Sequence, residues 1–348
     1  MKTKIFILVF CGLLSSFASY TQTPNATPPA DFNERKTLFQ HLQQYDKILI
    51  KTKFDSLMVS RSRAGKQEAV LIAVGDNTLK MSLSVEPRGV FRRRTCDVPP
   101  LKLDFSKPEL DSLGLHPNYD HLKLVTHCML NTENRLSILK EYWTYKMYQE
   151  VTPNSFLVHL FEITYQDINN KENKIKNLAF LIENTEEMAH RINGTIIRGM
   201  GKTPADITPA SYQETLLFQY MIGNTDWDVL LERNVKFVQK PNENKLTLVP
   251  YDFDFTGFTK PPYWKLVPVA GKKLNVDNRI PMGVFNSEVA LLETASRFLA
   301  LKKTGFQCYK TCPILTASDK KIMGDYLQSF FRLLKKESSL TKLFLEEK

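Results

Sequence analysis

Two short segments in the C-terminal half carry the residue types best suited to chemistry. The first is GNTDWDVLLERN at residues 223–234, and the second is PYDFDFTGF at residues 250–258. Hard oxygen donors of this kind suit Mg²⁺, which leaves coordination positions for phosphate oxygens. A further carboxylate nearby can accept a proton from an attacking hydroxyl. The candidate donors and acceptors are Asp226, Asp228, Asn234, Asp252 and Asp254.

The element that must position these residues is a hairpin between the two segments. Residues 233–255 contain two strand-like runs around a polar turn, and a helix is expected at Ser211–Met221 just before the first segment. Because a hairpin returns the chain on itself, we expect Asn234 and Asp252 to face the same cavity as Asp226. Asp and Asn are also common in turns, where they cap backbone groups. Because two such clusters occur, a functional site is favoured over a purely structural role of these residues in turns.

The chain before the acidic segments is rich in strands. Five strand-like runs separated by turn signals predict an antiparallel meander over residues 47–128, followed by a long helix at Glu133–Glu150 and two more strands ending near Glu183. The rest is mainly helix and loop. This is an α+β pattern of two segregated parts. We expect an N-terminal β-rich lobe at residues 33–183 and a C-terminal helical lobe at residues 184–348, with a ligand cleft between them.

The N-terminus has the pattern of a secretory signal. Lys2 and Lys4 precede the apolar run Ile5–Leu14, and small and polar residues follow it. The run is too short to span a bilayer. We therefore predict a signal peptide at residues 1–20, a flexible Pro/Thr-rich leader at residues 21–32, no membrane span, and export to the periplasm or the medium.

Four cysteines lie beyond the predicted signal, and an even number in an exported chain favours disulfides over zinc. Cys96 and Cys128 each border a strand-like run and are expected to pair. Cys308 and Cys312 would then close a small loop.

The formal net charge of +10 is compatible with binding to a nucleic acid. However, no dense basic tract with interleaved aromatic residues accompanies it, so no specific nucleic acid is expected. A phosphate-rich ligand is at least as natural a partner.

Several longer stretches resemble a known family. LKLVTHC, the segment from NRLSILKEYW to LAFLIEN, YMIGNTDWD with RNVKF, and VPYDFDFTG occur in order between residues 85 and 258. In this order they are similar to the bacterial kinase-like family named after spore coat protein H (CotH), and more narrowly to an uncharacterised exported subgroup. The resemblance implies a two-lobed protein-kinase-like fold: an N-terminal antiparallel sheet with one long helix, and a mainly helical C-terminal lobe.

The resemblance also implies cofactors and roles. The ligands would be ATP, or another nucleotide, and Mg²⁺. The acceptor would be a protein or a cell-envelope component. Asp226 would be the catalytic base, with Asp228 second, and Asn234, Asp252 and Asp254 would form the metal set. Glu183 would lie at the hinge near the adenine, and Glu141 would orient a phosphate-binding lysine. Lys102 is the first choice for that lysine and Lys123 the second, while arginines, Arg88 and Arg92 among them, would hold phosphates.

Two other functions stay open at this point. A kinase-like scaffold could serve as a catalytically inactive binding or assembly module of the cell envelope. A metal-dependent hydrolase could use the same acids, although the histidine-poor clusters offer no dedicated metal cage.

Overall fold

The computed structural model describes residues 34–59, 65–129, 134–172, 174–261 and 279–345. The predicted signal peptide and leader, residues 1–32, lie outside these ranges. Among the described helices, none combines the length and the apolar character that a membrane crossing requires.

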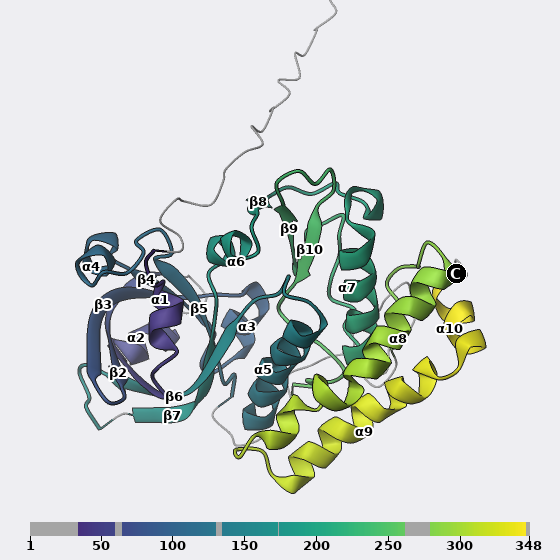
Figure 1. Ribbon diagram of the computed structural model, residues 1–348. Coiled ribbons are helices and arrows are strands. Elements are labelled where there is room, and N and C mark those ends of the chain that lie inside the picture. Colours follow the sequence, from purple (N-terminus) through teal and green to yellow (C-terminus); the bar gives the residue numbers. More distant parts are fainter. Residues whose placement is uncertain (1–33, 60–64, 130–133, 173, 262–278, 346–348) are drawn as a thin grey trace, which may run out of the picture.

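Seven strands form a closed barrel in the N-terminal half (Figure 1). The alternation of buried and more exposed residues is clear in the first strand, where Ile48 and Ile50 are buried. The barrel order is β1-β2-β3-β4-β5-β7-β6; all neighbours pair antiparallel except β6 and β1, which pair parallel. The bounds are β1 (Lys47–Thr52), β2 (Gln67–Val74), β3 (Thr78–Pro87), β4 (Leu101–Phe105), β5 (His121–Thr126), β6 (Val158–Asp167) and β7 (Lys174–Ile182).

The barrel overturns the predicted fold class. The five expected strands do form an antiparallel meander, but the two-lobed protein-kinase-like arrangement of an open sheet and a helical lobe is wrong. The sheet closes because β1 pairs with β6, with Lys47 opposite Glu162. Strand alternation could not reveal this, since an open sheet and a barrel both present one apolar face to a core.

Four short helices belong to the barrel half. They are α1 (Leu38–Leu42), α2 (Phe54–Val59), α3 (Val90–Thr95) and α4 (Lys107–Ser112). α1 and α2 place Leu38, Phe39, Phe54 and Leu57 in the same buried cluster as the inward side chains of the barrel strands. α3 differs, because it lies on the side of the barrel that faces the rest of the molecule (Figure 1).

A long helix between two barrel strands packs against the C-terminal half of the chain. α5 (Asn134–Val151) leaves β5 and returns to β6, yet its buried residues, such as Leu139 and Tyr148, belong to a second cluster built mainly from C-terminal residues. The helix predicted at Glu133–Glu150 is therefore confirmed. It packs beside α7 (Pro209–Ile222) and α8 (Glu288–Thr304).

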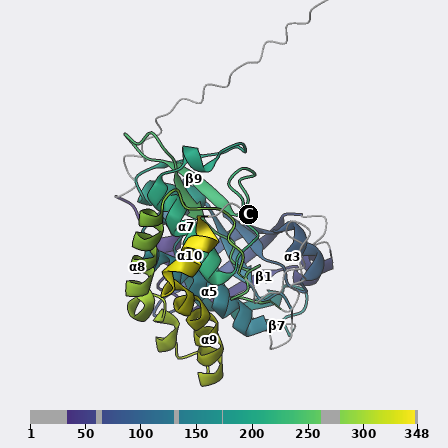
Figure 2. The same ribbon diagram turned by 90° about the vertical axis from the view of Figure 1, so that its right-hand side faces the viewer.

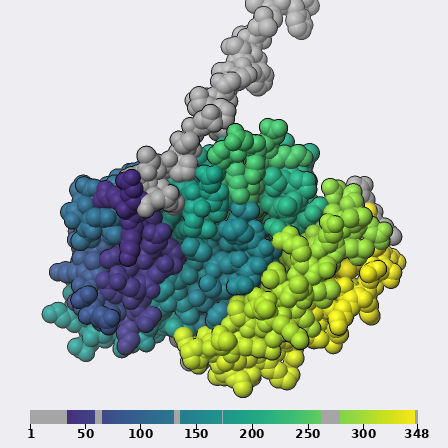
Figure 3. Space-filling view, viewed as in Figure 1, coloured from purple at the N-terminus to yellow at the C-terminus, as the bar shows by residue number. Residues whose placement is uncertain are grey.

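The C-terminal half combines helices with a small antiparallel sheet of order β10-β9-β8. Figures 1 and 2 show the helices gathered on the side opposite the barrel, and Figure 3 shows their side chains along one face of the molecule. The predicted hairpin is present as β9 and β10. The remaining bounds are α6 (Thr185–Arg191), β8 (Thr195–Ile197), η2 (Pro204–Asp206), β9 (Val235–Gln239), β10 (Thr247–Pro250), η3 (Cys308–Thr311), α9 (Ala317–Leu334) and α10 (Glu337–Phe344).

Candidate functional site

Backbone hydrogen bonds link the loops that carry the two acidic segments. Gly223 caps the C-terminus of α7 with a left-handed φ of 67°. A Cβ added at this position would lie only 2.4 Å from the Tyr326 hydroxyl, so the site requires glycine. The Gly257 N–H then donates to the Gly223 carbonyl at 3.1 Å, and the Phe258 N–H donates to the Ile222 carbonyl at 3.0 Å. The loop after α7 and the loop after β10 are therefore held side by side.

Six of the predicted residues line one cavity of about 460 Å³: Asp226, Asn234, Asp252, Asp254, Arg88 and Arg92. The Asn234 amide donates to the Asp226 carboxylate at 3.1 Å and to the Asp226 carbonyl at 2.6 Å. The Asp226 side chain keeps 46% of its surface exposed. The opposite wall of the cavity comes from the barrel half, at Arg88 and the start of α3.

The backbone at two of these residues is unusual. Asn234 and Asp252 have φ of 53° and 62°, a left-handed region that only a minority of non-glycine residues adopt. Asp252 is held there because its N–H donates to the Tyr145 hydroxyl at 2.8 Å, and the Tyr251 N–H donates to the Asn234 carbonyl at 3.0 Å. Such conformations persist where the surroundings fix them, and they cluster at functional sites.

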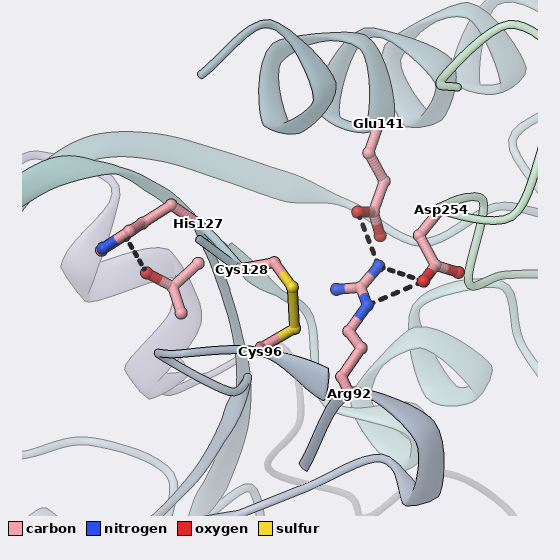
Figure 4. The surroundings of a disulfide bond; sticks show 7 residues. Arg92, Cys96, His127, Cys128, Glu141 and Asp254 are labelled. Atoms are coloured by element: carbon pink, nitrogen blue, oxygen red, sulfur yellow. Dashed lines mark hydrogen bonds and ion pairs between the residues drawn. A yellow bond between two sulfur atoms is a disulfide. The ribbon is translucent and has the colours of Figure 1, made fainter. Parts of the chain in front are cut away.

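Arg92 and Asp254, which line the cavity, form a buried ion-pair cluster with Glu141 (Figure 4). The Arg92 Nε donates to Asp254 Oδ2 at 2.7 Å, and its Nη2 donates to Glu141 Oε2 at 3.1 Å. The three side chains are only 9%, 4% and 7% exposed, in the order Arg92, Glu141, Asp254. Burial raises the pKa of Glu141 to about 8 and that of Asp254 to about 6, while the Arg92 guanidinium opposes both shifts.

This cluster shows the partners of three predicted site residues. Asp254 was expected to bind metal, but its carboxylate is engaged by Arg92. Arg92 was expected to hold phosphate, but its guanidinium is engaged by two carboxylates. Glu141 was expected to orient a lysine, and its partner is Arg92 instead. Charge pairing explains these partners, because a buried carboxylate is stabilised by a cation and the Arg92 guanidinium lies within reach of both.

Lys102 lies away from the cavity. Its ammonium pairs with Asp104 at 2.8 Å on the outer face of the barrel. Its cross-strand neighbour Lys123, the second choice, lies nearer to the acidic loops. The Lys123 ammonium sits 4.9 Å from the centre of the Tyr251 ring, and burial, with Arg88 and Lys236 adding to it, lowers its pKa to about 7 while Asp252 opposes the shift.

Two further predicted residues have other partners. The Glu183 carboxylate accepts from Arg191 Nε at 2.7 Å and from the Leu157 N–H at 3.0 Å, so it ties the end of α6 to the residue that precedes β6. Asp228 accepts from the Leu231 N–H at 2.8 Å and caps a turn. Neither residue is among those that line the 460 Å³ cavity.

Sequence reasoning missed Tyr145 and Arg233. Tyr145 is four positions after Glu141 on α5, a spacing that puts both on one helix face, and this could have signalled it. Arg233 precedes Asn234 and places a guanidinium nitrogen 3.8 Å from the Asp226 carboxylate. It lies inside the quoted acidic segment, so its charge was visible but unused.

The predicted Cys96–Cys128 disulfide is confirmed, and it lies beside the ion-pair cluster (Figure 4). The expected Cys308–Cys312 bond is wrong, because the structure leaves both as free thiols. The short helical turn η3 spans these residues, and Cys312 is buried in the C-terminal core.

A second buried carboxyl gives a pH prediction. Glu187 on α6 accepts from the Thr37 hydroxyl, and burial, with Glu183 adding to it, raises its pKa to about 8 from 4.5. Between these pH values the folded chain holds a proton that the unfolded chain has released. The free energy of unfolding should therefore fall as pH rises from 4.5 to 8.

Glu187→Gln should remove the part of this fall that Glu187 contributes, so the stability of the variant relative to wild type should increase from pH 5 to pH 8 by a few kcal/mol. Urea unfolding across this range measures it. Glu186→Gln is the control, since Arg198 holds the pKa of Glu186 below its usual value despite burial, leaving it ionised throughout. Parallel stability curves for wild type and Glu187→Gln would contradict the prediction.

The comparisons with known proteins include a distant structural similarity. No family model matches the chain, and no curated protein matches its sequence. The structure titled "Crystal structure of A Helicobacter pylori proinflammatory kinase CtkA" is similar with a TM-score of 0.36 and 9% identity, over 80% of this chain and 92% of that one. Membership of the spore coat protein H family stays a prediction.

Proposed function

We propose that the cavity binds the phosphates of a nucleotide with Mg²⁺ and transfers the terminal phosphoryl group to an acceptor hydroxyl. The observation that carries the proposal is the convergence of Asp226, Asn234 and Asp252 on one cavity, with Asp226 still half exposed. The acceptor we expect is a protein or cell-envelope component, reached after export of the chain.

The donors present fit Mg²⁺. Asp252 and Asn234 offer carboxylate and amide oxygens, the hard ligands that this ion takes. Among the described residues, no three His, Cys, Asp or Glu side chains form a metal cage. That arrangement suits an ion that keeps waters and substrate phosphates as ligands. Bound there, Mg²⁺ would offset the negative charge of the phosphate oxygens.

The chain's own residues divide the remaining tasks. Arg88 lines the cavity, and Lys123 lies beside it, so both can face phosphate oxygens. Asp226 would accept the proton of the acceptor hydroxyl as that oxygen bonds to the terminal phosphorus and the bridging bond to the nucleoside diphosphate breaks. Burial raises the pKa of Asp226, with Asp252 adding to it against Arg233 and Asn234, which makes the carboxylate a better proton acceptor.

The test of this proposal compares binding with transfer. Wild-type protein should gain thermal stability with Mg²⁺ and ATP together, and should transfer label from the terminal phosphate to proteins of a cell-envelope extract. Stabilisation without transfer to any acceptor would favour the inactive binding module. A transition metal that stays bound through purification, with no nucleotide effect, would favour the hydrolase.

Asp226→Asn should separate the two activities. The amide keeps the shape and the hydrogen bond from Asn234 but cannot accept a proton, so transfer should fall about 10²–10⁴-fold while nucleotide stabilisation remains. Label transfer and melting temperature measure the two effects. Asp228→Asn is the matched control, since Asp228 caps a turn outside the cavity. Equal transfer by both variants would rule out Asp226 as the base.

A further inference from the structure

One turn of α3 connects the disulfide to the ion-pair cluster. Cys96 is the C-cap of α3, and its N–H donates to the Arg92 carbonyl at 2.9 Å. Its partner Cys128 lies just beyond the end of β5, where the Val98 N–H donates to the Cys128 carbonyl at 3.1 Å. The disulfide therefore fixes the end of α3 to the barrel within one turn of the guanidinium that pairs with Glu141 and Asp254 (Figure 4).

α3 is a short helix with few buried side chains. It is six residues long, and isolated helices of this length do not persist in water. All six residues are described, and Arg92 is the buried one, while Val90 and Phe91 are 68% and 42% exposed. The Phe91 ring contacts that of Phe255 at 5.1 Å between centroids. The contacts that hold α3 thus include the disulfide, this ring contact and the ion pairs of Arg92.

The same short stretch forms one wall of the cavity. Arg88, Gly89, Val90, Phe91 and Arg92 all line it. On the other wall, Asp254 is two residues from Asp252, so the carboxylate that Arg92 holds belongs to the same loop as the proposed metal ligand. Release of α3 would both open the cavity and leave two buried carboxylates without their cation.

We propose that the Cys96–Cys128 disulfide acts as a clamp on Arg92, and that Arg92, as a positioning residue, keeps the nucleotide site formed, so that the site exists only in the oxidised chain. This rests on the proposed function for its nucleotide readout. Whether the disulfide holds α3 in place can be measured without any ligand. It differs from a general staple, which would stabilise the whole fold without favouring this site.

The experiment compares three proteins, each oxidised and after reduction with a phosphine, with thiol counting to verify the redox state. They are wild type, Cys96→Ser/Cys128→Ser and, as the matched control, Cys308→Ser/Cys312→Ser, which removes the two free thiols. Hydrogen exchange of residues 88–96 and of β1–β3 is followed beside the dissociation constant for ATP with Mg²⁺. Exchange reports on the clamp, and the constant reports on the site.

Reduction of wild type should speed exchange at residues 88–96 while β1–β3 stay protected. If the competent fraction falls to a tenth, the dissociation constant rises about tenfold. Cys96→Ser/Cys128→Ser should behave like reduced wild type, and Cys308→Ser/Cys312→Ser like oxidised wild type. Unchanged exchange of residues 88–96 after verified reduction would overturn the clamp, and so would unchanged affinity. Loss of protection in β1–β3 together with residues 88–96 would also overturn it, since the bond would then be a general staple.

The two proposals fail in different ways. If oxidised wild type binds no nucleotide with Mg²⁺, the proposed function is wrong, and the exchange of residues 88–96 still decides whether the disulfide holds α3. If oxidised wild type binds and reduction leaves the affinity unchanged, the proposed function stands and the clamp is wrong.

Discussion

Replacing Arg92 with methionine should lower the free energy of unfolding by about 3–5 kcal/mol, because Glu141 and Asp254 would stay buried without their cation. Methionine keeps much of the apolar stem, so the loss isolates the guanidinium. Urea unfolding at pH 8, monitored by circular dichroism, measures it. Arg94→Met is the matched control on the same helix, where Arg94 is exposed and a change should stay within about 0.5 kcal/mol.

The deficit of Arg92→Met should shrink as the solution becomes more acidic. Burial already raises the pKa of Glu141 to about 8 and that of Asp254 to about 6, and loss of Arg92 raises both further. Protonation makes each carboxyl neutral, which removes the need for a cation. The difference between variant and wild type should thus be smaller at pH 5 than at pH 8. A deficit equal to that of Arg94→Met at both pH values would refute the buried ion-pair cluster.

The second large effect is expected at Asp252. Asp252→Asn should abolish the stabilisation by ATP that depends on Mg²⁺, which for a ligand at about 100 times its Kd is roughly 2.7 kcal/mol. Asparagine is chosen because it tolerates the left-handed φ of 62°, whereas alanine would add backbone strain. Without ligand, the melting temperature should therefore remain near that of wild type.

Melting curves with ATP alone, Mg²⁺ alone and both together measure this effect. Asp228→Asn makes the same chemical change outside the cavity and should keep the full shift. If Asp252→Asn keeps it as well, Asp252 holds no ion, and the proposed function loses its metal ligand.

The secondary structure that was predicted correctly follows from local residue patterns. The strands, the long helix and the β9–β10 hairpin follow from residue periodicity, and Asp226, Asn234 and Asp252 were visible because each lies in a dense polar cluster. The partners of buried charges were not visible. Arg92, Glu141 and Asp254 meet from three distant segments, and nothing local to any of them names the other two.

The choice between two lysines shows the same limit. Lys102 and Lys123 are directly opposite each other on neighbouring strands, so the alternation of residues treats them alike. What separates them is which part of the outer barrel surface the C-terminal half covers. The C-terminal half places Tyr251 against Lys123, whereas Lys102 pairs with Asp104. Tertiary packing of this kind is not encoded in any short window of sequence.

The parallel pairing of β1 with β6 also governs when the molecule can assemble. β1 is complete at Thr52 and can pair with β2 on one edge, yet its partner on the other edge, β6, begins only at Val158, so a chain emerging N-terminus first holds one unpaired edge of β1 for more than a hundred residues. Contacts this distant in sequence slow folding, and exposed strand edges invite association between chains. The early strands should therefore depend on protection during synthesis until β6 and β7 have emerged, and a truncation before Ile182 should yield aggregates rather than a smaller folded domain.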